Sequence, residues 1–165
     1  MNDAKKITAA NQTACGSELN SSMECETQRM EEAGAILPYF IGAAQLAVLQ
    51  EGFSGEEHAF FTEKVLELGE LFETMPKTYE QDGLGDEAVA HLHYFMGGMD
   101  WFITEKDMNE EQLQAFGLCD LGMGFPEIGY VSLPEILANG AELDLCWTPK
   151  TLATIKKGRS SPSGT

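Results

Sequence analysis

The sequence predicts an α+β fold in which a helical segment is followed by an antiparallel sheet with short helices. Two hydrophobic patterns support this prediction. Apolar side chains recur over residues 55–75 with the 3.6-residue period of an amphipathic helix, and they alternate over residues 89–95 with the two-residue period of a half-buried strand. A loop rich in glycine and aspartate, residues 81–86, separates the two patterns. A length of 165 residues suits one domain of about 100 to 200 residues.

The N-terminal part is expected to contain a disordered segment followed by a buried helix. Residues 1–28 are polar and hold few large apolar side chains, so we expect a disordered segment. Residues 33–49 then form a run of 17 uncharged positions, which is shorter than the roughly 20 residues of a membrane-spanning helix. Because proline suits the first turn of a helix, we expect a buried core helix that starts near Pro38.

Residues 55–75 are the clearest predicted helix. Ser54 and Glu57 have the spacing of a capping box, and Pro76 ends the periodic pattern. At about 100° per residue, one face collects apolar side chains and the opposite face collects glutamates. The apolar positions are Phe61, Val65, Leu68, Phe72 and Met75, and the acidic positions are Glu56, Glu63, Glu67 and Glu70. We expect the first face in the core and the second in solvent.

Short apolar runs after residue 86 predict the sheet. Gly97 and Gly98 favour a hairpin turn between two strands. Further strands are expected at residues 100–104, 113–119, 128–131 and 143–147, with short helices after Ser132 and after Pro149. The basic segment 156–165 is expected to be a flexible tail. These boundaries give a single domain at residues 29–155, with a helical part at 29–76 and a sheet part at 86–155.

The net charge is the least ordinary property of the sequence. The chain has 27 acidic and 10 basic residues, a formal charge of −17, and residues 31–155 alone carry −19 from 23 acidic and 4 basic residues. Such a surface repels nucleic acid and anionic membranes and attracts basic protein surfaces. We therefore expect a basic protein partner and no direct binding to nucleic acid or membrane. The candidate protein-binding residues are Glu56, Glu63, Glu67 and Glu70 with the sheet-edge acids Asp100, Glu105 and Asp107.

Two other interpretations of these acids stay open. A high net charge can serve solubility alone. Asp100, Glu105 and Asp107 also offer oxygen ligands for a cation, although three acids near a strand end are more often a solvated edge that prevents strand pairing.

Common catalytic motifs are absent from the sequence. It contains no Walker loop, no Gly-x-Ser-x-Gly elbow and no His-Glu-x-x-His pair. His91 and His93 are weak candidates for metal ligands, because side chains two apart on a strand share a face and Glu105 on the neighbouring strand can join them. Histidines among apolar neighbours are more often structural. We expect no metal, no cofactor and no catalytic residue, and a binding protein rather than an enzyme.

The cysteines indicate the redox compartment. Cys15, Cys25, Cys119 and Cys146 lack Cys-x-x-Cys spacing, and residues 1–10 contain no apolar stretch of the kind that a signal peptide needs. We expect free thiols and a cytoplasmic location.

Five blocks within residues 86–155 carry a resemblance to a known family. They are an apolar tract with His-Tyr-Phe at 93–95, Asp-Trp-Phe-Ile-Thr-Glu at 100–105, Gln-Ala-Phe-Gly-Leu at 114–118, Glu-Ile-Gly-Tyr-Val-Ser-Leu at 127–133, and Glu-Leu-Asp-Leu at 142–145 before Trp-Thr-Pro-Lys at 147–150. In this order they resemble the domain of unknown function 2958 (DUF2958). The resemblance implies cargo of plasmids, conjugative elements or phages, near antirestriction and DNA-processing functions, and it implies no catalytic residues.

Three functional hypotheses follow. The leading one is a non-enzymatic accessory protein of a mobile genetic element that docks on the basic surface of a nucleic-acid enzyme, as an anti-restriction or anti-CRISPR protein would. The second is a small metal-dependent hydrolase or other enzyme that uses His91, His93 and nearby carboxylates. The third is a passive structural subunit.

Overall fold

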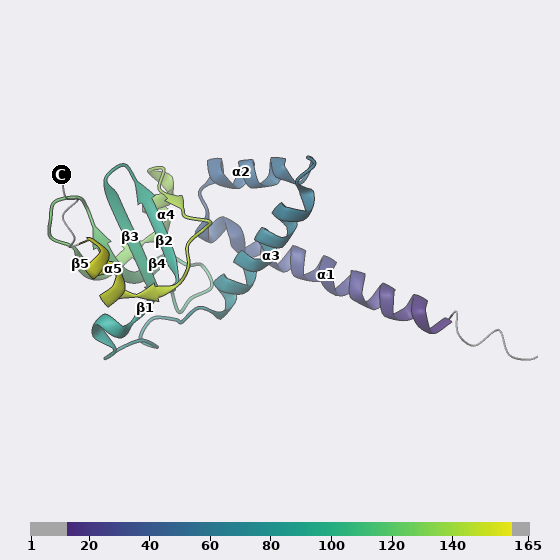
Figure 1. The fold of residues 1–165 in the computed structure, drawn as a ribbon, viewed down its shortest axis with the longest axis horizontal. Coiled ribbons are helices and arrows are strands. Elements are labelled where there is room, and N and C mark those ends of the chain that lie inside the picture. Colours follow the sequence, from purple (N-terminus) through teal and green to yellow (C-terminus); the bar gives the residue numbers. More distant parts are fainter. Residues whose placement is uncertain (1–12, 160–165) are drawn as a thin grey trace, which may run out of the picture.

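The computed structural model describes residues 13–159, and the side chains of residues 23–159. Helices precede the sheet, and short helices lie between and after its last strands, which confirms the predicted α+β fold (Figure 1). The helices are α1 (Thr13–Phe40), α2 (Ala43–Gly52), α3 (His58–Thr74), the 3₁₀ turn η1 (Gly85–Glu87), α4 (Leu133–Ala138) and α5 (Leu152–Arg159). The strands are β1 (Val89–Ala90), β2 (Leu92–Met96), β3 (Met99–Glu105), β4 (Gln114–Asp120), β5 (Glu127–Ser132), β6 (Glu142–Leu143) and β7 (Lys150–Thr151).

Five strands form one antiparallel sheet in the order β5-β4-β3-β2-β6, and β1 pairs with β7 beside it. The predicted hairpin is confirmed: Met96 pairs with Met99, and Gly97 takes a φ of 58° that favours glycine. Gly117 allows β4 to lie close to β3, because a Cβ there would sit 2.1 Å from the Phe102 carbonyl oxygen. The sheet register therefore depends on glycine at this position.

The helical part and the sheet part share one core. Leu37 and Phe40 of α1 and Phe72 of α3 belong to the same buried cluster as Tyr94 and Trp101 of the sheet. The Phe40 and Phe72 rings stack with centroids 4.2 Å apart, and the Tyr94 hydroxyl donates a 2.7 Å hydrogen bond to the Phe40 carbonyl. Burial of that hydroxyl raises its pKa. The helices α1 to α3 are thus fixed on one face of the sheet.

The opposite face of the sheet carries a smaller core under the C-terminal helix. Phe102 and Leu118 from the strands pack there with Leu152 and Ile155 of α5. The predicted flexible tail is corrected in part, because α5 extends to Arg159 and its guanidinium bonds both Asp100 (2.8 Å) and Asp120 (2.6 Å). Residues 160–165 lie outside the described residues.

The N-terminal helix differs most from the sequence prediction. Instead of a helix that starts near Pro38, α1 ends at Phe40 and includes Pro38 in its last turn. Its buried residues Ala33, Leu37 and Phe40 follow helical spacing across that proline, with Ala33 and Leu37 before it. Gly42 is extended (ψ 149°) and separates α1 from α2. Within the part of the chain that the structure describes, no helix combines the length and apolar character needed to cross a membrane.

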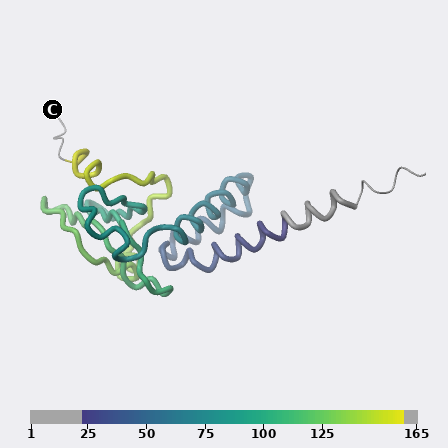
Figure 2. Tube along the Cα trace, turned by 90° about the horizontal axis from the view of Figure 1, so that it is seen from below, coloured from purple at the N-terminus to yellow at the C-terminus, as the bar shows by residue number. Residues whose placement is uncertain are grey.

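The predicted disordered segment 1–28 is helical from Thr13 onward, and residues 1–12 lie outside the described residues. The side chains from Met23 to Arg29 are exposed, so the core does not hold this half of α1. Local bonds support it instead, such as Thr27 Oγ1 to the Met23 carbonyl (2.9 Å). Figure 1 shows the N-terminal half of α1 projecting away from the rest of the molecule, and Figure 2 shows its later half running beside α3. The prediction of disorder is therefore wrong for residues 13–28, which are helical.

Two further boundaries differ from the predictions. The helix α3 begins at His58, and Ser54 does not cap it, because the residue at the N-cap position is Glu57 and Ser54 lies in the turn after α2, where its N–H bonds the Glu51 carbonyl. The strand expected at 143–147 is limited to Glu142–Leu143. Asp144 ends it by accepting the Cys146 N–H at 3.0 Å on its own side chain, which forms a turn.

A buried lysine joins the helical layer to the sheet. Lys106 follows β3, is 6% exposed, and its ammonium donates to the carbonyls of Phe72 (2.5 Å) and Glu73 (2.7 Å) at the end of α3. These carbonyls have no partner within the helix, and a cation also suits the negative end of the helix dipole. Lys106 is therefore the C-terminal cap of α3.

Candidate functional site

The helices α1 and α3 pack closely and leave an acidic groove between them. Ala33 meets Gly69, where an added Cβ would lie 2.6 Å from the Ala33 Cβ. Two shallow hollows of about 270 and 550 Å³ lie along this contact. Their glutamates are Glu26, Glu32, Glu63, Glu67, Glu70 and Glu73, and all six are exposed. We call these six residues the acidic α1–α3 groove.

Basic side chains compensate little of this charge. Residues 23–74 contain 11 acidic and 2 basic residues, a net charge of −9. Arg29 approaches Glu70 at 3.9 Å, and Lys64 bonds Glu67 at 2.6 Å. Ion pairs near the surface such as these contribute little to stability, so they break at little cost when a partner binds. The groove therefore presents a negative potential to solvent.

Three predicted binding residues, Glu63, Glu67 and Glu70, lie in this groove. The fourth, Glu56, is exposed in the turn before α3 and lines neither hollow. The helical periodicity of the sequence was sufficient to place the three on one face. It did not show that α1 adds Glu26 and Glu32 to them, because residues 1–28 were expected to be disordered.

The sheet-edge acids do not form a second exposed patch. Glu105 is 3% exposed, and its carboxylate accepts the backbone N–H groups of Tyr79 (3.1 Å) and Gln81 (2.5 Å). Asp107 accepts the N–H groups of Asn109 (3.0 Å) and Gln114 (2.9 Å). Burial acts to raise the pKa of Asp107, but these backbone donors outweigh it and lower the pKa. Both carboxylates organise loops rather than a docking edge.

Asp100 belongs to a polar network around His93. The imidazole Nε2 lies 2.8 Å from Asp100 and Nδ1 lies 3.2 Å from Asp144, while the ring stacks on Phe102 at 4.7 Å. Asp100 also accepts a 2.8 Å bond from Arg159. This network connects β2, β3 and α5, so Asp100 and His93 have structural partners.

The second histidine is arranged differently. His91 lies between β1 and β2, its N–H bonds the Ile103 carbonyl at 2.8 Å, and partial burial lowers the pKa of its imidazole. No group of three or more His, Cys, Asp or Glu side chains among the described residues is arranged to hold a metal ion. In the same part of the chain Cys25, Cys119 and Cys146 are free thiols.

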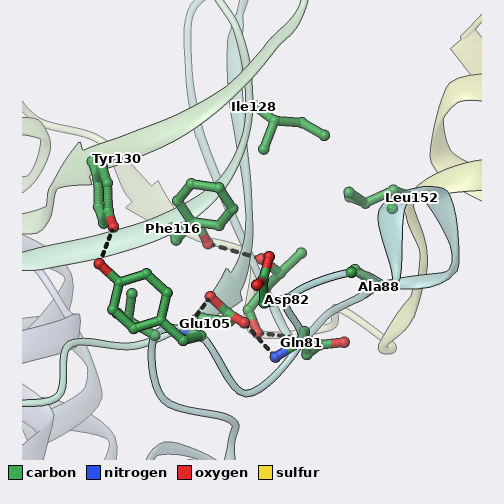
Figure 3. Close-up of a pocket in the computed structure, with 13 residues that line it drawn as sticks. Gln81, Asp82, Ala88, Glu105, Phe116, Ile128, Tyr130 and Leu152 are labelled. Carbon is green, nitrogen blue, oxygen red and sulfur yellow. Dashed lines mark hydrogen bonds between the residues drawn. The ribbon is translucent and has the colours of Figure 1, made fainter.

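A cavity of about 370 Å³ lies on the sheet face opposite α1 to α3. Phe116 of β4, Ile128 and Tyr130 of β5 form its walls with Tyr79, and Asp82 and Glu105 contribute carboxylates. In Figure 3, Tyr130 lies on one side, and Ala88 and Leu152 lie on the other. We call these six lining residues, Tyr79, Asp82, Glu105, Phe116, Ile128 and Tyr130, the aromatic cavity.

The two tyrosines of the cavity are connected. The Tyr130 hydroxyl donates to the Tyr79 hydroxyl at 3.1 Å. This bond raises the pKa of Tyr130, and the nearby Glu105 charge acts in the same direction. Tyr79 has a φ of 78°, which is uncommon for a residue with a side chain. Sequence reasoning missed this cavity, because a loop, three strands and the start of α5 meet only in the fold.

The fold and these features define an α+β protein with an acidic helical groove on one part and an aromatic cavity on another. Residues 66–147 match the family model described as "Protein of unknown function (DUF2958)". Residues 66–147 therefore belong to this family, and the match begins within α3, earlier than the resemblance at residues 86–155 had suggested. No curated protein and no solved structure matches the chain.

Proposed function

We propose that this is a non-enzymatic docking protein whose acidic α1–α3 groove binds a basic surface of a protein partner. The observation that carries the proposal is the row of exposed carboxylates on two helices that pack directly against each other. The buried faces of α1 and α3 hold Leu37 and Phe72 in the core, so Glu32 and the four carboxylates of α3 are presented on a packed support, while Glu26 lies on the half of α1 that the core does not hold. A preformed surface loses less entropy on binding than a flexible tail does.

The spacing of the carboxylates suits a surface that normally binds a phosphate backbone. Glu63 to Glu73 extends over ten residue steps, which is about 15 Å of helix at 1.5 Å per residue. Four carboxylates of α3 lie within that length, and α1 adds others beside them. One nucleic-acid strand carries a phosphate about every 3.4 Å along its axis. The groove thus offers a row of negative charges whose density along the helix is somewhat lower than that of the phosphates along a nucleic-acid strand.

The partner class follows from this similarity. A basic groove that binds nucleic acid through Lys and Arg attracts the acidic α1–α3 groove through the same long-range field. The resemblance to mobile-element cargo leads us to extend the proposal to counter-defence. The partner is then a host restriction enzyme or an RNA-guided nuclease, and the protein blocks it by occupying its nucleic-acid-binding surface.

A capture experiment with matched variants tests the proposal. Wild-type protein, the groove variant (Glu63→Gln, Glu67→Gln, Glu70→Gln) and a control variant (Glu110→Gln, Glu111→Gln, Glu127→Gln) are immobilised and exposed to host lysate at low salt. Both variants change the net charge from −17 to −14, since each replaces three glutamates, but only the first changes the groove. Bound proteins are eluted with duplex DNA and identified by mass spectrometry.

The proposal expects a basic partner that wild type and control variant capture equally, that the groove variant captures weakly, and that duplex DNA displaces. Equal capture by all three proteins would contradict the role of the groove. A partner that DNA does not displace would contradict the competition with nucleic acid.

A further inference from the structure

We infer that the aromatic cavity binds the guanidinium group of an arginine side chain presented by a protein partner. This inference rests on the proposed function, because the arginine is taken to belong to the same basic partner. It adds a specific anchoring site to an attraction that is otherwise long-range.

The size and walls of the cavity suit such a group. Its volume of about 370 Å³ lies within the range of roughly 300 to 1,000 Å³ that is typical of small-ligand sites. The Phe116 and Tyr130 rings form a corner, with centroids 5.2 Å apart and an interplanar angle of 67°. Cations bind over the faces of such rings, and the flat guanidinium also stacks on them.

The charge of the lining selects a cation. Asp82 and Glu105 line the cavity, whereas its lining within the described chain includes no lysine, arginine or histidine. An anionic ligand such as a phosphate would find no positive partner there. Glu105 is only 3% exposed, and a buried negative charge is costly unless it is paired. A bound cation would pair with this carboxylate and reduce that cost.

Glu105 retains capacity for a ligand. Each of its oxygens accepts one backbone N–H, from Tyr79 or Gln81, while a carboxylate has about four acceptor positions in all. Asp82 is exposed and adds a second carboxylate to the same cavity. Guanidinium has five donors in a planar fork, which two carboxylates and two hydroxyls can accept together. This donor number favours arginine over lysine.

The loop that carries Tyr79 is fixed before a ligand arrives. Its left-handed backbone at φ 78° is held by the bond from the Tyr79 N–H to Glu105 and by the hydroxyl bond from Tyr130. An uncommon backbone conformation persists only where its surroundings determine it. Tyr79 as a whole is 66% exposed, so it is held beside the cavity without being buried in the core.

A nuclear magnetic resonance titration with N-acetylarginine amide as the probe tests the inference. We expect saturable shifts of backbone amides confined to the lining of the cavity. N-acetylcitrulline amide, which has a similar shape and no charge, should bind at least fivefold more weakly, and so should N-acetyllysine amide. Absence of saturable shifts with arginine, or equal binding of the citrulline or lysine compound, would overturn the inference.

Variants with matched controls locate the site. Asp82→Asn and Tyr130→Leu change exposed side chains of the cavity and should each weaken binding of the arginine probe at least threefold. Glu87→Gln and Tyr39→Leu change exposed residues that do not line the cavity and should leave binding unchanged. Equal effects of both pairs would overturn the assignment. Amide spectra and melting temperatures confirm that each variant is folded, and Asp82→Asn is the milder change if Tyr130→Leu unfolds.

The experiments distinguish failure of the cavity inference from failure of the proposed groove function. The groove variant leaves all lining residues of the cavity intact, so it should bind N-acetylarginine amide as wild type does. A groove variant that loses its partner while wild type ignores the arginine probe would overturn the cavity inference alone. Arginine binding without any groove-dependent partner would leave the cavity assignment in place and contradict the proposed function of the groove.

Discussion

Replacing the buried Lys106 with methionine should destabilise the whole fold. The side chain keeps most of its apolar stem in this variant but loses the ammonium that caps α3. A hydrogen bond to a charged group contributes roughly 1.5 to 3 kcal/mol. Burial removes water from the ammonium and lowers the pKa of Lys106, and this cost offsets part of the gain from the two bonds. We expect a net loss of about 2 kcal/mol in the free energy of unfolding.

The measurement is urea unfolding followed by circular dichroism, with thermal unfolding beside it. For a domain of this size, about 2 kcal/mol corresponds to a fall of roughly 4 to 8 °C in melting temperature. Lys77→Met is the control, because Lys77 is exposed and has no bond to a helix end. It should change stability by less than about 0.5 kcal/mol. A Lys106→Met variant as stable as wild type would refute the view that this lysine joins the helices to the sheet.

Two further predictions concern α5 and the contact between α1 and α3. Asp120→Asn removes the ion pair with the half-exposed Arg159 and should cost about 1 kcal/mol at pH 7. The N–H of Gly122, and next Arg159, lower the pKa of Asp120 in the folded state, so its stabilisation is complete above about pH 5 and is lost as the pH falls through the folded pKa. The stability difference between wild type and variant should therefore shrink below about pH 4, and a constant difference from pH 7 to pH 3 would contradict this. Gly69→Ala should destabilise by about 1 to 2 kcal/mol in urea unfolding, since the new Cβ would overlap Ala33. Gly34→Ala, with nothing within 4 Å, should be neutral or stabilising, and the opposite order would show that the helices do not pack as described.

The sequence predicts those elements of this fold whose signal is local. The two faces of α3 follow from the spacing of Val65, Leu68 and Phe72. The β2–β3 hairpin follows from Gly97 and its neighbours. In contrast, the pairing of Val89 with Thr151 joins residues far apart in the chain and has no local signal. The exposed half of α1 is also hidden from sequence, because a polar composition describes an exposed helix and a disordered segment equally well.

The candidate site, like the fold, is predictable from the sequence only where its signal is local. Helical periodicity placed Glu63, Glu67 and Glu70 on one face, and the structure gives them α1 as a neighbour. The charge of Glu105 suggested an exposed edge, but a loop more than twenty residues earlier in the chain covers it and donates two N–H groups. Composition counts a charge without showing whether it is buried. The aromatic cavity depends entirely on such long-range contacts.

The salt dependence of partner binding tests the central claim most directly. The partner recovered by elution with DNA is purified, and its dissociation constant is measured between about 50 and 200 mM salt for wild type, groove variant and control variant. The account predicts that the groove variant (Glu63→Gln, Glu67→Gln, Glu70→Gln) binds at least fivefold more weakly at low salt, with a flatter salt dependence, while its stability is equal or slightly higher because repulsion between Glu63 and Glu67 is relieved. The control variant, with the same net charge, should follow wild type. Three superimposable salt curves from folded proteins would contradict the account and leave the negative charge with no role in docking at this groove.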